Sequence, residues 1–206
     1  MPQELALSRP RLAQLLGARL THDLAGPLGT IMAASGAAGG AALLAETVAE
    51  LRLRLRLYAV VFGEPEAMSL ADLRALLAGS PAAHRVDFRI ELPAMESVPA
   101  DLAQIILAAA MLAAEALPRG GSVRLVQLPG EGSGTLAVLA EGRIAAWPHS
   151  LIERIAGLPP VEPDSPRGLL APWLLALAEG AHCRVSLGLG QPGLPPLLLR
   201  PRNGGG

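Results

Sequence analysis

With 206 residues the chain is long enough for one large domain or two small ones, and its core must be aliphatic, because 51% of the residues are apolar but only 2% aromatic. A formal net charge of -1 argues against nucleic acid as the main ligand, since binding a polyanion needs a concentrated basic surface. One cysteine, Cys183, excludes an internal disulfide, and no apolar stretch is long enough to cross a bilayer, so we expect a soluble, cytoplasmic protein.

The first part of the chain predicts a helical hairpin. Helices are expected over residues 8–35 and 41–62, where apolar residues recur at steps of three and four, with the glycine-rich breaker GAAGG between them. The stretch LRLRLRL also fits a strand, but the apolar seam continues through it, which favours a helix. Two helices cannot enclose a core alone, so we predict that residues 1–63 dimerise into a four-helix bundle. The apolar positions are Leu12, Leu16, Leu20, Leu24, Leu28 and Ile31 on the first helix, and Leu44, Val48, Leu51, Leu55, Tyr58 and Phe62 on the second.

The remainder, residues 64–206, predicts a second domain in which helices and strands alternate. The connector GEPEAMS separates it from the hairpin, PGEGSG at residues 129–134 predicts a hairpin loop, and the NGGG tail is expected to be disordered. The whole chain is therefore expected to be an α+β protein. Helices are expected near residues 70–78, 100–117, 150–156 and 168–179, and strands near residues 85–92, 122–128, 135–140, 184–189 and 196–200.

His22 is the candidate reactive residue of the first helix. It lies two positions from Leu20 and from Leu24, so at about 100° per residue its side chain should point away from the apolar stripe. Its neighbours on that face are mostly alanine and glycine, which would leave the imidazole accessible to another protein. We expect a partner to bind on this face. The residues expected to border the partner are Leu15, Arg19 and Gly26. Taken alone, His22 fits an ordinary surface histidine equally well.

The residues that follow His22 favour a functional role. His22, Asp23, Leu24, Pro27 and Leu28 reproduce the pattern H-[DE]-L-x-x-P-L of the phosphoacceptor helix in dimeric histidine kinases. The proline is informative, because a proline inside a helix removes a hydrogen bond and costs about 3 kcal/mol. We expect it to bend the helix just beyond the histidine, and the alternative is that it starts a second helix.

The longer string ARLTHDLAGPLGTI, at residues 18–31, resembles the ChpT family of alphaproteobacterial histidine phosphotransferases, whose pattern is close to R-L-x-H-D-L-x-S-P-L-G-A-I. EALPRGG at residues 115–121 resembles a second stretch of that family. Gly26 replaces the family's usual serine, and Thr21 stands where cysteine is common. The resemblance covers nearly the whole chain. It implies a kinase-like homodimer in which the phosphoacceptor hairpin is followed by an ATPase-like (Bergerat-type) α/β sandwich without nucleotide chemistry.

Three motifs of working kinases are degraded in this second domain. The helix expected at residues 102–117 lacks the asparagines that hold magnesium, and AEGRI at residues 140–144 replaces D-x-G-x-G. The glycine-rich phosphate loop is reduced to SPRGLL at residues 165–170. We therefore expect no ATP binding, no cofactor and no metal site in this chain, with Mg²⁺ supplied by the partner.

The resemblance implies a phosphotransferase that relays a phosphoryl group between receiver-domain aspartates in a two-component phosphorelay. His22 would be the nucleophile, and Asp23 would orient its ring or act as a general base. The expected partners are response-regulator receivers and the receiver of a hybrid histidine kinase. Arg52 and Arg56, like their neighbour Arg54, offer charge for docking on acidic receivers, although a solvated helix face remains open for at least one of them. Two rival functions are a genuine kinase fragment that uses ATP and a non-catalytic dimeric adaptor.

Overall fold

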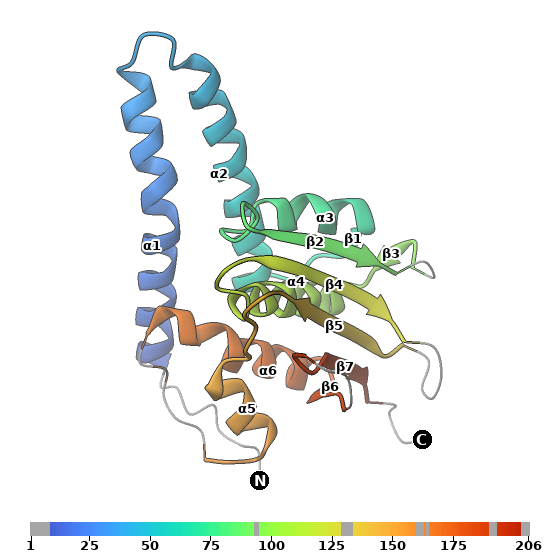
Figure 1. The fold of residues 1–206 in the computed structure, drawn as a ribbon. Coiled ribbons are helices and arrows are strands. Elements are labelled where there is room, and N and C mark those ends of the chain that lie inside the picture. The colour runs from blue at the N-terminus through green and yellow to red at the C-terminus, as the bar shows by residue number, and fades with distance from the viewer. Residues whose placement is uncertain are drawn as a thin grey trace.

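A long helical hairpin stands beside a mixed α/β body in the computed structural model, which describes residues 9–92, 95–128, 134–159, 163, 165–189 and 193–202 (Figure 1). The hairpin consists of α1 (Arg9–Ser35) and α2 (Ala41–Phe62), joined at the glycine-rich breaker. The LRLRLRL stretch is helical, and Pro27 lies inside α1 rather than at the start of another helix. The expected hairpin is confirmed, while its assembly into a four-helix bundle stays a prediction.

The body is built on one five-stranded sheet. Its strands are β2 (Val86–Glu91), β4 (Gly121–Gln127), β5 (Leu136–Glu141), β6 (Cys183–Leu187) and β7 (Leu197–Pro201), in the spatial order β2-β4-β5-β7-β6. β2 runs parallel to β4, and the other neighbouring pairs are antiparallel. β1 (Met68–Ser69) and β3 (Ser97–Val98) form a separate antiparallel pair. The sequence pattern missed this pair because each strand is too short to show an alternation.

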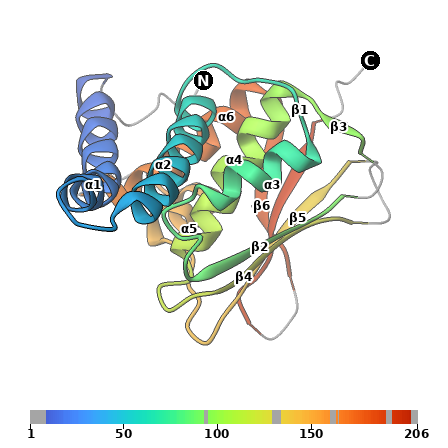
Figure 2. The same cartoon turned by 90° about the horizontal axis from the view of Figure 1, so that it is seen from above.

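Helices α3, α4 and α6 cover one face of the sheet (Figure 2). The helices of the body are α3 (Leu70–Ala78), α4 (Ala100–Glu115), α5 (His149–Ile155), the 3-10 helix η1 (Pro166–Leu169) and α6 (Leu170–Gly180). The expected elements all occur within a few residues of their expected limits, so the α+β class is confirmed. The expected loop at residues 129–134 lies almost wholly outside the described residues, as does the NGGG tail. None of the described helices is both long and apolar enough to cross a membrane.

Helix α4 is the centre of the core. All its side chains from Ala103 to Ala114 are buried. The helix contacts α2, α3 and α6 as well as the strands β4 and β5, so it needs an apolar surface on every side. Its sequence, made almost entirely of alanine and larger aliphatic residues, meets that need. The same core continues into the lower half of α2 through Leu57 and Val61.

Side-chain hydrogen bonds fasten the end of α2 to the body. The last carbonyl groups of a helix have no partner within the helix. Gln104 Nε2 of α4 donates to the carbonyl oxygens of Val60 (2.8 Å) and Gly63 (3.0 Å), and Trp173 Nε1 of α6 donates to that of Val61 (2.7 Å). The lower half of the hairpin therefore shares both core and hydrogen bonds with the body. The division into domains at residue 63 stays a prediction.

Candidate functional site

His22 stands on α1 with its ring open to solvent, as its position opposite the apolar stripe predicted. Its side chain is 74% exposed, and its Nδ1 lies 3.0 Å from Oδ1 of Asp23. Among the described residues none hydrogen-bonds its Nε2. A neutral imidazole that donates its Nδ1 proton to a carboxylate keeps the free lone pair at Nε2. Nε2 is therefore the nucleophilic atom that this geometry leaves accessible.

Asp23 is held through both oxygens of its carboxylate. Oδ1 faces His22, and Oδ2 accepts a 2.5 Å hydrogen bond from the hydroxyl of Tyr58 on α2. Burial raises the pKa of Tyr58 and the adjacent carboxylate of Asp23 raises it further, so the hydroxyl keeps the proton that it donates. The ring of Tyr58 packs against that of Phe62. A carboxylate fixed in this way can select the tautomer of His22 that carries its proton on Nδ1.

Arg19 joins the histidine helix to the body. Its Nη2 donates to Oε1 of Glu115 at the end of α4 over 2.7 Å, and its Nη1 lies 3.4 Å from the carbonyl oxygen of Pro166 in η1. Its Nε lies 3.6 Å from Oδ2 of Asp23. Burial alone would lower the pKa of Arg19, but the carboxylates of Glu115 and Asp23 outweigh it and raise that pKa. Arg19 therefore stays charged and links the turn that contains His22 to α4.

Two residues expected at a partner-binding surface are instead buried within the chain. Arg19 is 7% exposed because of its contacts with the body, and Leu15 is 3% exposed because it packs with Leu169 of η1. The expectation that these two border an accessible surface is wrong. Helical periodicity places both on the face of His22, but it does not show that η1 covers the neighbouring part of that face.

The three other residues expected at that surface, Gly26, Arg52 and Arg56, are exposed. A Cβ at Gly26 would meet nothing within 4 Å, so the serine that is usual in the resembled family would fit there. Arg54 of α2 faces α1, and at about 100° per residue Arg52 and Arg56 therefore point away from α1. The structure brings Gly26 within one turn of His22 but does not bring these two arginines to it.

Three residues around the site carry functional contacts that the sequence pattern does not reveal. The pattern places Tyr58 in the apolar seam and Arg54 among the docking charges, yet Arg54 is buried and its Nη1 donates to the carbonyl oxygen of Asp23 over 3.0 Å. Arg54 precedes Tyr58 by four residues, and this spacing was the available signal that both face α1. Glu115 opens the EALPRGG stretch, and its ion pair with Arg19 connects the two stretches that resemble the ChpT family.

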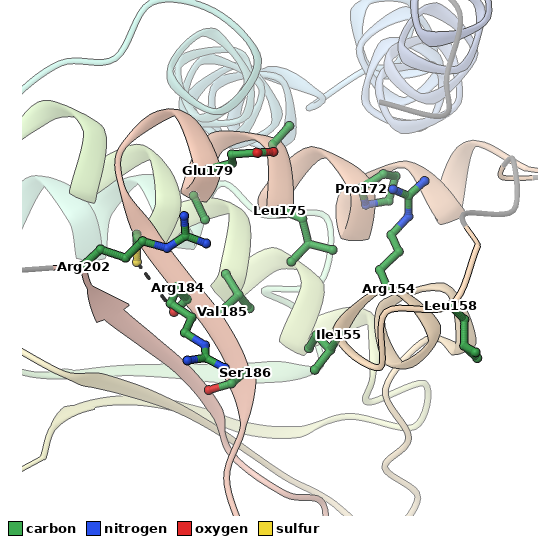
Figure 3. Close-up of a pocket in the computed structure, with 13 residues that line it drawn as sticks. Arg154, Ile155, Leu158, Pro172, Leu175, Glu179, Arg184, Val185, Ser186 and Arg202 are labelled. Atoms are coloured by element: carbon green, nitrogen blue, oxygen red, sulfur yellow. Dashed lines mark hydrogen bonds between the residues drawn. The ribbon is translucent and has the colours of Figure 1, made fainter. Parts of the chain in front are cut away.

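A separate cavity of about 300 Å³ lies between α5, α6 and β6 (Figure 3). Its lining includes Arg154, whose Nε and Nη2 are buried without a hydrogen-bond partner among the described residues. Arg154 lies beside Pro172, whereas Arg184 and Arg202 lie at the other end of the cavity (Figure 3). The three guanidinium groups do not converge on one point. Within the described part of the chain, no three His, Cys, Asp or Glu side chains come together as metal ligands.

Comparison with known proteins assigns this arrangement to a family. Residues 70–192 match the family model described as the histidine phosphotransferase C-terminal domain. The chain belongs to this family. It is 28% identical over 203 residues to protein phosphotransferase ChpT of Brucella abortus (strain 2308), covering 91% of this chain and 94% of that protein. A solved structure described as a bacterial phosphotransferase has a TM-score of 0.73 at 22% identity, covers 94% of this chain and 97% of the other, and shares its fold.

These matches confirm the expected family and the expected function. The protein is a histidine phosphotransferase that acts as a phosphorelay carrier. The matched family segment begins at residue 70, after the hairpin. The match therefore does not include His22, and the reacting atom has to be assigned from the geometry of α1 and α2.

Proposed function

We propose that this phosphotransferase carries its phosphoryl group on Nε2 of His22, between the aspartates of separate receiver domains. The observation that carries the proposal is an exposed imidazole whose other nitrogen lies 3.0 Å from a tethered carboxylate. In phosphoryl transfer most of the catalysis is positioning and charge neutralisation. A carrier therefore needs little more than an accessible nucleophile held in the right orientation.

Uptake exchanges a phosphorus–oxygen bond for a phosphorus–nitrogen bond, and transfer to the acceptor exchanges the phosphorus–nitrogen bond for a phosphorus–oxygen bond. Nε2 attacks the aspartyl phosphate of the donor receiver in line, and the aspartate leaves as a carboxylate while the new bond forms. The phosphorylated ring gains a positive charge, which the carboxylate of Asp23 at the Nδ1 proton stabilises, or neutralises by accepting that proton. Attack by the aspartate of an acceptor receiver then reverses these steps.

We propose that the receiver brings the Mg²⁺ that transfer needs. Magnesium prefers carboxylate oxygens, but the carboxylate of Asp23 is committed to His22 and Tyr58, and that of Glu115 to Arg19. We also propose that the body is a degenerate ATPase-like domain that binds no nucleotide. In this proposal α4 takes the place of the magnesium-binding helix of kinases, and it offers buried aliphatic residues in place of asparagines.

A second copy of the chain is the partner proposed for the hairpin. Figure 1 shows the tip of the hairpin extending beyond the body. Apolar side chains are exposed along the hairpin, namely Leu28, Met32, Leu43, Val48 and Leu55. Monomeric proteins rarely expose large contiguous apolar patches, so we propose that these side chains meet a partner. A homodimer in the form of a four-helix bundle would cover them.

The remaining partners proposed are receiver domains, both of response regulators and of a hybrid histidine kinase, met in the cytoplasm. Gly26 lies one turn beyond His22 and leaves room for the backbone of a receiver. Arg52 and Arg56 are exposed on the side of α2 that faces away from α1, and Arg56 Nη2 lies 3.5 Å from Oε1 of Glu66. We propose that their positive charge attracts an acidic receiver during its approach and does not contact the receiver's active site.

The test is phosphoryl transfer from a panel of phosphorylated receivers to the wild-type protein and to His22→Ala. We expect the substitution to abolish uptake while changing the free energy of unfolding by no more than about 0.5 kcal/mol, as at most exposed sites. His149→Ala, at another exposed histidine, is the matched control and should keep uptake. Uptake by His22→Ala at the parental rate would contradict the proposal. Uptake from ATP would support the kinase rival, and receiver binding without any transfer would support the adaptor.

A further inference from the structure

Pro27 leaves one backbone carbonyl of α1 without its helical partner. In an α-helix the N–H of a residue donates to the carbonyl four positions earlier, so position 27 would normally serve Asp23. Proline has no N–H, and α1 continues through this position. The carbonyl oxygen of Asp23 therefore needs a donor from outside the helix, because an unpaired carbonyl packed against protein is unfavourable.

Arg54 on α2 supplies this donor. Its Nη1 lies 3.0 Å from the carbonyl oxygen of Asp23, its Nε donates to the carbonyl oxygen of Gly79 over 3.3 Å, and its Nη2 pairs with Glu50. The buried guanidinium thus has partners on α1, on α2 and at the end of α3. Gly79 permits this approach, since a Cβ there would lie 2.5 Å from the backbone of Leu53.

Arg54 and Tyr58 lie one turn apart on α2 and hold Asp23 at two points. Arg54 fixes its backbone carbonyl and Tyr58 fixes its carboxylate, so Oδ1 stays directed at Nδ1 of His22. We propose that Arg54 is a positioning residue for phosphoryl transfer, which acts through the carbonyl that Pro27 leaves open and thereby holds Asp23 against the histidine ring. The expected effect of Arg54 on the transfer rate rests on the proposed role of His22. Its expected effect on the orientation and tautomer of the His22 ring does not.

The residue at position 27 distinguishes the proposed role of Arg54 from a purely structural one, because the two roles predict different effects of removing Arg54 when Pro27 is replaced. If Arg54 only ties α2 to Gly79 and Glu50, its removal has the same effect whichever residue occupies position 27. If it acts through the carbonyl of Asp23, then Pro27→Ala restores an N–H for that carbonyl and makes Arg54 partly dispensable. A double-mutant cycle over the two positions separates these cases.

The experiment compares the wild-type protein with Arg54→Met, Pro27→Ala and the double variant. We expect Arg54→Met to lower the maximal transfer rate from a phosphorylated receiver about 10- to 100-fold, as when a reacting group is misplaced. The receiver concentration at half saturation should not change, because Arg54 is buried and cannot reach the partner. Nitrogen NMR of the His22 ring should show a loss of the tautomer protonated at Nδ1. Both effects should shrink in the Pro27→Ala background.

Arg89→Met, at an exposed arginine of β2, is the matched control and should change neither readout. An effect of Arg54→Met that is equal in both backgrounds would overturn the inference. If Arg54→Met does not fold, Arg54→Lys takes its place in the cycle, since its ammonium can reach one carbonyl but not all three partners. If no receiver phosphorylates the wild-type protein, the proposed function fails, while the NMR measurement still decides whether Pro27 and Arg54 are coupled.

Discussion

The two ends of the helical hairpin are built differently. Toward the body, Leu15 and Leu57 are buried, and Arg19 is fastened to α4 and η1. Toward the tip, Leu28 and Met32 are exposed. A single chain therefore completes the lower half of the hairpin, whereas the upper half exposes apolar side chains that the proposed dimer would cover. The turn of α1 that contains His22 lies between these two halves.

The largest expected effect is the loss of stability when a buried leucine of the lower half is replaced, compared with the replacement of an exposed leucine of the upper half. Leu57→Ala empties a fully buried site and should lower the free energy of unfolding by about 2–5 kcal/mol. Leu28→Ala should change the stability of the isolated chain by no more than about 0.5 kcal/mol, as at most exposed sites, but should weaken the proposed dimer. Urea unfolding measures the first effect and sedimentation at several concentrations the second. Equal destabilisation by both substitutions, without a change in association, would show that the two halves of the hairpin are not built differently.

The sequence is sufficient to predict most of the fold, because the elements depend on local patterns. The apolar periodicity of α1 and α2 predicts both helices, and the glycine-rich breaker predicts the turn between them. The strands of the five-stranded sheet follow from alternation and turn residues in the same way. The exposure of His22 follows too, since it depends only on its position relative to the stripe on its own helix.

The contacts around the histidine could not be predicted, because they join elements far apart in the chain. Glu115 meets Arg19 across 96 positions, and no periodicity on α1 indicates a partner at the end of α4. The position of Pro27 shows that the carbonyl of Asp23 is open, but it does not say which donor fills it. The burial of Leu15 fails as a sequence prediction for the same reason, since η1 covers it from outside the hairpin.

Tyr58→Phe probes the boundary between the two halves of the hairpin. The substitution keeps the ring, which packs against Phe62, and removes the hydroxyl that donates to Oδ2 of Asp23. We expect a loss of about 1.5–3 kcal/mol in the free energy of unfolding, the range for a hydrogen bond to a charged group, and slower transfer that is not abolished. Urea unfolding and transfer kinetics check both effects. An unchanged transfer rate would show that the hydroxyl does not position Asp23.

Of the effects predicted here, the smallest is the change that Glu115→Gln should make in the pH dependence of the free energy of unfolding. Burial raises the pKa of Glu115 above its ordinary value of 4.5, although Arg19 opposes this. A carboxyl with a higher pKa in the folded state contributes stability that is fully present below its unfolded pKa and is lost as the pH rises through the folded pKa. Glutamine does not titrate, so the wild-type protein should lose stability relative to the variant over that window. Urea unfolding of both proteins at a series of pH values checks this. A wild-type protein that gains stability relative to the variant as the pH rises would contradict it.

The proposed role of His22 can be tested by locating the phosphoryl group on the phosphorylated protein. The wild-type protein would be incubated with a phosphorylated receiver and examined by mass spectrometry and phosphorus NMR. The geometry predicts one phosphohistidine, at His22, with phosphorus bonded to Nε2, because Nδ1 is occupied by Asp23. A phosphoryl group on Nδ1 of His22, or on any other residue, would contradict the account.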